Sequence, residues 1–152
     1  MKRVLITGMS ASGKSSVARE LRARGYKAVD TDDGFSEPLP DGRQQWREDA
    51  LRSLLATEDA DVLFVAGCEE NQVQFHPEFD QIVLLSAPAE TLVERLATRT
   101  TNSYGKDPEE LRRFLEDLEH VEPRLRRVAD HEVMTTAALD EVVTTVLRLV
   151  DA

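Results

Sequence analysis

The feature that most constrains this chain is a complete G-x-x-x-x-G-K-[ST] motif at residues 8–15, directly after a strand-like apolar run at residues 4–7. Glycines in such a loop permit backbone angles at which successive N–H groups converge on phosphate oxygens. Lys14 reaches the β and γ phosphates, and the Ser15 hydroxyl can bind Mg²⁺. Helical apolar spacing follows, so a helix N-terminus faces the phosphates. The sequence therefore predicts a nucleoside triphosphate site with contacts from Gly8, Ser10, Ala11, Ser12, Gly13, Lys14, Ser15 and Ser16.

Composition narrows the class of ligand. The 152 residues carry a formal net charge of −10, from 29 acidic and 19 basic residues. Phosphate backbones are held mainly by Lys and Arg, so small ligands are favoured over nucleic acid. The single cysteine, Cys68, cannot form an internal disulfide or a cysteine metal cluster, and the apolar stretches are too short to span a membrane. We expect one cytoplasmic domain at residues 1–152, monomeric or homodimeric, with no membrane partner.

The order of secondary-structure signals predicts an α/β fold. Apolar runs of strand length lie at residues 4–6, 27–29, 62–66, 82–85 and, more weakly, 132–135. Segments with helical spacing lie at residues 13–24, 43–55, after Pro88, at 107–128 with an interruption at Pro123, and from Leu139 onward. Strands that alternate with helices give a doubly wound parallel sheet covered on both faces. Ligands of such folds lie beyond the carboxyl ends of the strands.

Carboxylates follow the second predicted strand at Asp30, Asp32 and Asp33. Phosphoryl transfer needs Mg²⁺ held by oxygen ligands and a carboxylate that orients the acceptor hydroxyl, so Asp30 and Asp32 could divide these two tasks, with Asp33 beside them on the substrate side. The alternative is a solvated acidic turn. The third strand carries no acid, which leaves Ser15, Asp30, the nucleotide and water as metal ligands, and Gly67 at its end leaves space for a substrate.

Cations follow the fourth predicted strand. Arg95 and Arg99 lie four residues apart on one helical face, before a polar loop that ends near Lys106. We expect a mobile lid at about residues 99–107 that brings Arg99, with help from Lys106, onto the transferring phosphoryl group, and we expect Arg95 to contact the nucleotide. Either arginine could instead be a solvated helix residue.

A second pair of arginines lies near the start of the second predicted helix. Arg43 and Arg47 have i, i+4 spacing, so one helical face would carry both. They could face the cleft and hold an anionic substrate, or form surface pairs with neighbouring acids. Both interpretations stay open from the sequence.

The chain resembles the nucleoside-monophosphate-kinase and shikimate-kinase group of small P-loop kinases. The resemblance rests on four features in this order: the phosphate loop, the acids after the second strand, Ala66-Gly67 at the end of the third strand, and the lid with its arginines. Residues 30–32 look like the D-[ST]-D element of shikimate kinases, in which the first acid organises Mg²⁺ and the second binds a substrate hydroxyl. Trp46-Arg47 falls near their F-R element, and residues 123–129 look like the segment that leads to their last strand. The resemblance also implies that residues 135–139, including Thr136, lie beside adenine.

Two departures argue against shikimate as the acceptor. Ala66-Gly67-Cys68 replaces the glycine triplet of that family, and Val121-Glu122 stands before Pro123, where the resemblance implies a carboxylate-binding arginine. An acid there would repel a carboxylate. Gluconate kinases offer a partial likeness in residues 38–41 followed by Trp46.

We therefore expect a three-layer α/β/α P-loop NTPase fold with a five-stranded parallel sheet in the order 2-3-1-4-5. The expected function is Mg²⁺- and ATP-dependent phosphoryl transfer to a small molecule, either a hydroxyl acceptor or a nucleotide, with Lys14, Asp32 and Arg99 as the catalytic residues. The alternative is a nucleotide-binding switch or accessory ATPase module without a small-molecule acceptor. Hydrolysis by water is a third possibility, although no water-positioning glutamine is evident after the third strand.

Overall fold

The computed structural model describes residues 1–100 and 102–152. Its centre is a parallel sheet whose strands are β1 (Lys2–Thr7), β2 (Lys27–Asp30), β5 (Val62–Ala66), β6 (Gln81–Ser86) and β7 (His131–Met134). Their order across the sheet is β2-β5-β1-β6-β7. When only the five strands of this sheet are numbered in chain order, their order across the sheet is 2-3-1-4-5. This is the predicted order, and the predicted fold class is confirmed.

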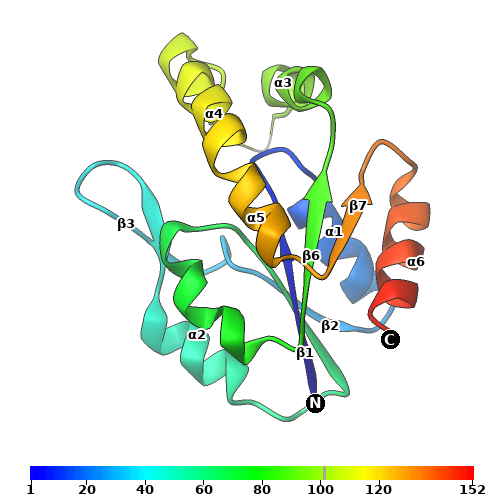
Figure 1. Ribbon diagram of the computed structural model, residues 1–152. Helices are drawn as coiled ribbons and strands as arrows, with labels where there is room; N and C mark the ends of the chain where they lie inside the picture. The colour runs from blue at the N-terminus through cyan, green and yellow to red at the C-terminus, as the bar shows by residue number, and fades with distance from the viewer. Residues whose placement is uncertain (101) are drawn as a thin grey trace.

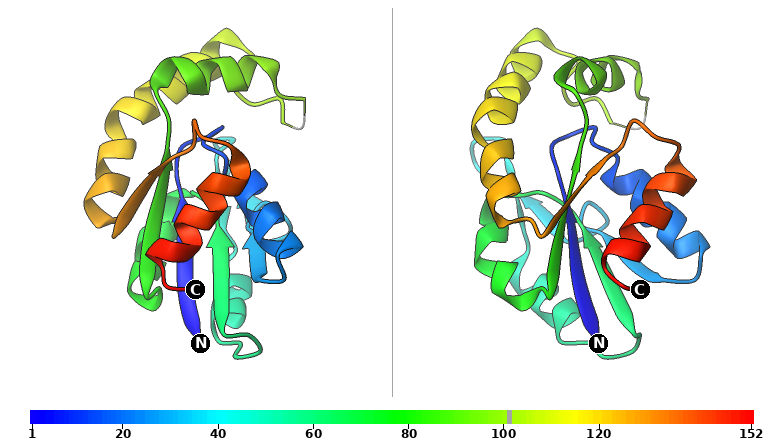
Figure 2. Two further views of the ribbon diagram at one scale, coloured as in Figure 1. Left: turned by 90° about the vertical axis from the view of Figure 1, so that its right-hand side faces the viewer. Right: turned by 45° about the vertical axis from the view of Figure 1, so that its right-hand side comes forward.

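Helices cover both faces of the sheet (Figures 1 and 2). The side chains of β1 alternate, because successive strand residues point to opposite faces. Val4 and Ile6 pack with α1 (Lys14–Ala23) and α6 (Leu139–Leu149), whereas Leu5 packs with α2 (Glu48–Leu55) on the other face.

A third apolar cluster lies towards the carboxyl end of the sheet. It joins Leu84 of β6 to α3 (Ala89–Thr98), α4 (Pro108–His120) and α5 (Glu122–Val128). Figure 1 shows α3 and the first turns of α4 standing beyond the strand ends. These two helices therefore overhang the edge of the sheet at which the phosphate loop begins.

The predicted helix over residues 43–55 is wrong in its first part. Gln44–Trp46 is a strand, β4, which pairs antiparallel with β3 (Ser36–Pro38), and α2 begins only at Glu48. Trp46 is fully buried against Phe75, with ring centroids 5.7 Å apart, and this contact holds the segment extended across the core.

A 3₁₀-helix was also not expected from the sequence. This element, η1, spans Glu70–Glu78 and follows β5. Its tight three-residue turn produces no α-helical apolar period, so the periodicity of the sequence did not indicate it. It supplies Phe75 to the core beneath Trp46.

The expected interruption at Pro123 is confirmed. Proline has no N–H for the helical ladder, and α4 ends at His120 before α5 begins at Glu122. The predicted N-cap is present as well, since Asp107 Oδ1 accepts a hydrogen bond from the Glu109 N–H at 2.8 Å. Within the described part of the chain, no helix has the length and apolar character needed to cross a membrane.

Candidate functional site

The phosphate loop connects β1 to α1 through a tightly packed backbone. A Cβ at Gly8 would lie 2.5 Å from the carbonyl oxygen of Leu85, so only glycine fits there. Gly13 is the N-cap of α1 with a φ of 106°, and Ala11 has a φ of 66°, which is uncommon for a residue with a side chain. Strained backbone of this kind clusters at ligand-binding sites. The first-turn N–H groups of α1 are available to an anion at this point.

Lys14 lies over the loop. Its Nζ donates hydrogen bonds to the carbonyl oxygens of Gly8 at 2.7 Å and Met9 at 2.8 Å. Burial lowers the pKa of Lys14, and the nearby carboxylates, including Asp32, partly counteract that effect. A buried ammonium group held by two carbonyls is positioned to exchange these partners for phosphate oxygens.

Ser15 and Asp30 bring two oxygens together beside the loop. The Ser15 hydroxyl donates to Asp30 Oδ2 at 2.6 Å, and the Asp32 N–H donates to Asp30 Oδ1 at 3.0 Å. The described residues contain no group of three or more His, Cys, Asp or Glu side chains arranged to hold a metal ion. A two-oxygen donor set fits Mg²⁺, which commonly keeps waters and takes phosphate oxygens as further ligands.

A cleft of about 760 Å³ runs over the phosphate loop. It brings together most of the residues that the sequence nominated, namely Ser10, Ala11, Gly13, Lys14, Ser15, Ser16, Asp30, Asp32, Asp33, Arg95 and Arg99. Gly8 and Ser12 do not line it; they belong to the packing under the loop, where Ser12 is buried. Arg19 and Arg22 of α1 also line the cleft and were not anticipated.

Arg95 ties the phosphate loop to the loop after β7. Its guanidinium donates to the carbonyl oxygen of Ala11 at 3.1 Å, to Thr135 Oγ1 at 3.0 Å and to the carbonyl oxygen of Thr135 at 2.8 Å. The Thr135 hydroxyl in turn donates to the carbonyl oxygen of Ser12 at 2.8 Å. Thr135 and Ala137 line the cleft, whereas the predicted contact residue Thr136 is exposed and does not.

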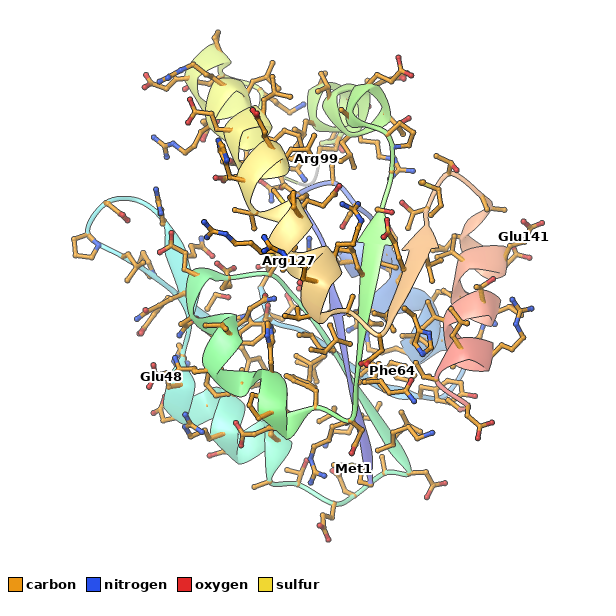
Figure 3. The ribbon with its side chains drawn as sticks, in the orientation of Figure 1. Met1, Glu48, Phe64, Arg99, Arg127 and Glu141 are labelled. Atoms are coloured by element: carbon orange, nitrogen blue, oxygen red, sulfur yellow. The ribbon has the colours of Figure 1, made fainter. Side chains whose placement is uncertain are left out.

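Arg99 is the C-cap of α3 and points back towards the loop. Its Nη2 donates to the carbonyl oxygen of Tyr104 at 2.8 Å and lies 3.5 Å from Ser10 Oγ, while its buried Nε has no partner among the described residues. In Figure 3 the labelled Arg99 lies below α3, on the side that faces the sheet. Burial lowers the pKa of Arg99. Lys106 is directed elsewhere, because its Nζ donates to the carbonyl oxygen of Ala97.

Arg43 and Arg47 do not line the cleft, and the helical spacing inferred for them does not exist. Arg43 forms ion pairs with Glu70 and, at 3.7 Å, with Asp41. Arg47 precedes α2 and donates to the carbonyl oxygen of Gly34 at 3.0 Å. The two arginines flank the strand β4 rather than share one helical face, and both are exposed.

Gly67 has a packing reason that the sequence did not reveal. A Cβ at this position would lie 2.2 Å from Thr31 Oγ1, and Thr31 is fully buried. The space beside the Gly67 Cα is therefore filled by Thr31. Gly67 does not line the cleft, and contact between a substrate and this glycine stays a prediction.

A comparison with protein families identifies the chain. A family model described as an AAA domain matches residues 4–119, which is more than half of the sequence. The chain belongs to this AAA-domain family. A comparison of the AAA-domain chain with curated protein sequences finds no match.

Solved structures resemble the AAA-domain chain over almost its whole length. A shikimate kinase from Acinetobacter baumannii in complex with shikimate has a TM-score of 0.74 at 15% identity, covering 99% of this chain and 93% of that one. A gluconokinase from Sinorhizobium meliloti has a TM-score of 0.68 at 22% identity, covering 99% and 91%. A sugar kinase from Janibacter sp. has a TM-score of 0.64 at 20% identity, covering 99% and 95%. The resemblance to small P-loop kinases is confirmed at the level of the fold.

Sequence reasoning left one further carboxyl group of the AAA-domain chain unassigned, which does not line the cleft but is influenced by the charges of Asp32 and Lys14. Glu69 follows β5, and burial together with the nearby charge of Asp32 raises its pKa to about 7. Burial also raises the pKa of Asp32. The signal in the sequence was the Glu-x-x-Gln spacing from Glu69 to Gln72, since a carboxylate and an amide three residues apart form a capping box at a helix start.

Proposed function

We propose that this protein is an ATP-dependent phosphotransferase that transfers the γ-phosphoryl group to a hydroxyl of a small molecule. The observation that carries the proposal is a cleft that is lined together by Lys14 and Ser15 of the phosphate loop, by Asp32 and by Arg99. A phosphate cradle, an acceptor-orienting acid and a cation are the parts that phosphoryl transfer uses. The fold shared with shikimate kinase and gluconokinase structures supports this class of reaction.

The strand order suggests how the two ligands divide the cleft. The loop after β7, with Thr135 and Ala137, lies on one side of the phosphate loop, and the residues after β2 and β5 lie on the other. We place the nucleotide base on the β7 side and the acceptor on the β2 and β5 side. Proposed contacts to ATP are Ser10, Ala11, Gly13, Lys14, Ser15, Ser16, Arg95 and the Thr135–Ala137 segment that contains Thr136.

Ser15 and Asp30 would hold Mg²⁺. Their oxygens already share a hydrogen bond, and a cation held between them would replace that bond while the hydroxyl keeps its proton. When bound, Mg²⁺ would neutralise negative charge on the β and γ phosphate oxygens. The protein's part is to hold the two ligands fixed, which the second hydrogen bond from the Asp32 N–H to Asp30 does.

In the proposed reaction the acceptor oxygen forms a bond to the γ phosphorus, and the bond from that phosphorus to the β–γ bridging oxygen breaks. Asp32 accepts the proton that the acceptor hydroxyl loses. Lys14 and Arg99 stabilise the charge that gathers on the transferring group and on the leaving ADP. We assign residues 99–107 to a lid on a single domain of residues 1–152; Thr101, within this lid, lies outside the described residues.

The test is ADP release from ATP and Mg²⁺ in the presence and absence of a panel of small metabolites. We expect one chemical class of metabolite to stimulate ADP release, and we expect Lys14→Ala to lower the stimulated rate by about 100-fold or more while the circular dichroism spectrum is unchanged. Tight ATP binding without stimulation by any metabolite would contradict the proposal and support the switch. Equal ADP release with and without metabolites would indicate hydrolysis by water.

A further inference from the structure

The side chain of Gln72 joins the 3₁₀-helix η1 to the start of the phosphate loop. Gln72 belongs to η1 and is buried. Its Nε2 donates to Thr7 Oγ1 at 3.3 Å, and the Thr7 hydroxyl donates to Gln72 Oε1 at 3.4 Å. Thr7 is the last residue of β1, is fully buried and directly precedes Gly8. A buried amide therefore contacts the residue from which the phosphate loop departs.

Two further contacts fix which way the Gln72 amide is turned. The Glu69 N–H donates to Gln72 Oε1 at 3.1 Å, and a backbone N–H can only donate, so the amide oxygen faces Glu69. The amide nitrogen then faces His76, whose Nε2 lies 3.2 Å from Gln72 Nε2. Because the amide nitrogen is a donor, His76 Nε2 accepts, which requires a neutral ring with its proton on Nδ1. Burial lowers the pKa of His76, in agreement with a neutral ring.

The opposite orientation of the Gln72 amide would bring donors face to face. Its NH₂ group would then lie against the Glu69 N–H, and the capping hydrogen bond would be lost. In the observed orientation the amide hydrogens go to Thr7 and His76, and the oxygen accepts from Glu69 and Thr7. A buried amide that is satisfied in this way resists reorientation, because a donor or acceptor left without a partner is costly. Gln72 therefore holds the Thr7 hydroxyl in one place.

The position of Thr7 bears directly on the lysine that meets the phosphates. The carbonyl oxygen of Gly8, the next residue, accepts a hydrogen bond from Lys14 Nζ at 2.7 Å. Gly8 is packed so closely against the Leu85 carbonyl oxygen that it has little room to absorb a shift. A displacement of Thr7 would therefore move the Gly8 carbonyl and, with it, Lys14 Nζ. Groups that bind a ligand need supporting residues that fix them in this way.

We infer that Gln72 is a positioning residue for the phosphate loop, acting through Thr7 on the Gly8 carbonyl. This carbonyl holds Lys14, and the neutral ring of His76 keeps the Gln72 amide in the required orientation. The inference deepens the proposed function and rests on it, because it concerns the same nucleotide site. Gln72 itself does not line the cleft. If it served only to cap η1, its loss would lower stability and leave the affinity for ATP unchanged.

The first test measures the Kd of a non-hydrolysable ATP analogue by isothermal titration. We expect Thr7→Val, which removes the hydroxyl and nearly keeps the shape, to raise this Kd by about fivefold to tenfold. Thr7→Ser, which keeps the hydroxyl, should bind as the wild type does. Gln72→Met should raise the Kd by a similar factor. The matched control is Gln74→Met, which changes an exposed residue of η1 that donates to Glu48 and should leave the Kd unchanged.

The double variant with Thr7→Val and Gln72→Met decides whether the two residues act as one unit. We expect its Kd to match that of Gln72→Met, whereas independent effects would multiply and overturn the inference. If Gln72→Met does not fold, the comparison of Thr7→Val with Thr7→Ser still decides, and equal affinity in those two variants would overturn the inference alone. A folded Gln72→Met with the wild-type Kd would do the same. A wild-type protein that does not bind the analogue would instead count against the proposed function.

The second test reads the protonated nitrogen of His76 by ¹⁵N NMR at about pH 8, where the ring is neutral. We expect the proton on Nδ1 and a bare Nε2 in the wild type, and loss of this preference in Gln72→Met. The spectrum of His120, which is exposed at the end of α4, should be the same in both proteins. A proton on Nε2 of His76 in the wild type would overturn the inference, because the Gln72 oxygen would then face His76 and not Glu69.

Discussion

Gly67 illustrates how one residue's identity is decided by a neighbour far away in the sequence. The Gly67 Cα faces the buried Thr31 side chain across the β2–β5 pair, and an added Cβ would lie 2.2 Å from Thr31 Oγ1. Thr31 Oγ1 has no hydrogen-bond partner among the residues that the structure describes, so the contact is one of shape alone. Overpacking a rigid core position forces shifts of the backbone or of rotamers. The glycine therefore sets the spacing of the two strand ends.

The corresponding prediction concerns Gly67→Ala. We expect this change to lower the free energy of unfolding by about 2 kcal/mol, measured by urea denaturation, because the methyl group has no space. Thr31→Ala removes the hydroxyl and the methyl group nearest the new Cβ, so the double variant should regain part of the loss. A single Gly67→Ala variant as stable as the wild type would show that the strand ends adjust freely.

Glu69 gives a prediction about pH. Its pKa is about 7 in the folded protein against 4.5 for the unfolded reference, so the folded state binds the proton more tightly. Stability is then highest below pH 4.5 for this group and falls as the pH rises towards about 7. Allowing for partial exposure, we expect the wild type to lose about 1 to 2 kcal/mol over this range relative to Glu69→Gln. If the free energy of unfolding varies with pH in the same way for the wild type and Glu69→Gln, the prediction is contradicted.

At the scale of elements, α3 carries two arginines with different surroundings. Arg95 makes three hydrogen bonds, to Ala11 and Thr135, and so joins the phosphate loop to the segment after β7. Arg99, one turn later, reaches Tyr104 and Ser10, and its Nε finds no partner in the part of the chain that the structure describes. The helix therefore presents one arginine that is fully engaged in fixing the site and one with a donor left for a ligand.

We expect Arg95→Ala to weaken ATP binding by about tenfold, because the base-side segment loses its attachment to the loop. The matched control is Arg112→Ala, which removes an exposed arginine of α4 whose ion pairs, within residues 1–100 and 102–152, are with Glu109 and Glu116. Isothermal titration with a non-hydrolysable ATP analogue measures both. Equal affinity in the two variants would mean that Thr135 keeps its place without Arg95.

Arg99→Ala should separate binding from turnover. We expect kcat to fall by about 100-fold while the Kd of ATP changes by less than about threefold, because the guanidinium meets the transferring group only as charge redistributes. Steady-state kinetics and titration of ATP give the two numbers. Equal losses in both would make Arg99 an ordinary phosphate contact, and the catalytic cation would then have to be sought elsewhere.

Sequence reasoning succeeded where a local pattern determines the structure. The phosphate loop, the five parallel strands and the break before Pro123 each have a short-range cause, such as glycine conformation, apolar runs or the missing proline N–H. It failed at residues 43–47, where Gln44–Trp46 form a strand whose Trp46 packs against Phe75 of a later element. It also left Glu69 unassigned, because its surroundings arise only when β2 and β5 pair.

At the scale of the whole molecule, the two chain ends lie close together (Figure 1). Lys2 Nζ donates to the carbonyl oxygen of Val150 at 2.6 Å. The tip of the β3–β4 hairpin is exposed, and Gly42 has no neighbour within 4 Å of an added Cβ. We expect a circular permutant opened at Gly42, with its old ends joined by a linker of about six residues, to fold and bind ATP. Loss of folding would show that the hairpin must be continuous.

The packing of α6 on α1 also bears on how the chain is made in the cell. Val4 and Ile6 are synthesised well before Val143 and Val146 of α6, which form part of their apolar cover. The phosphate loop is therefore complete as a sequence long before its supporting layer exists. A nascent chain that has not yet reached Leu139 would expose this apolar face and would be open to chaperones and proteases.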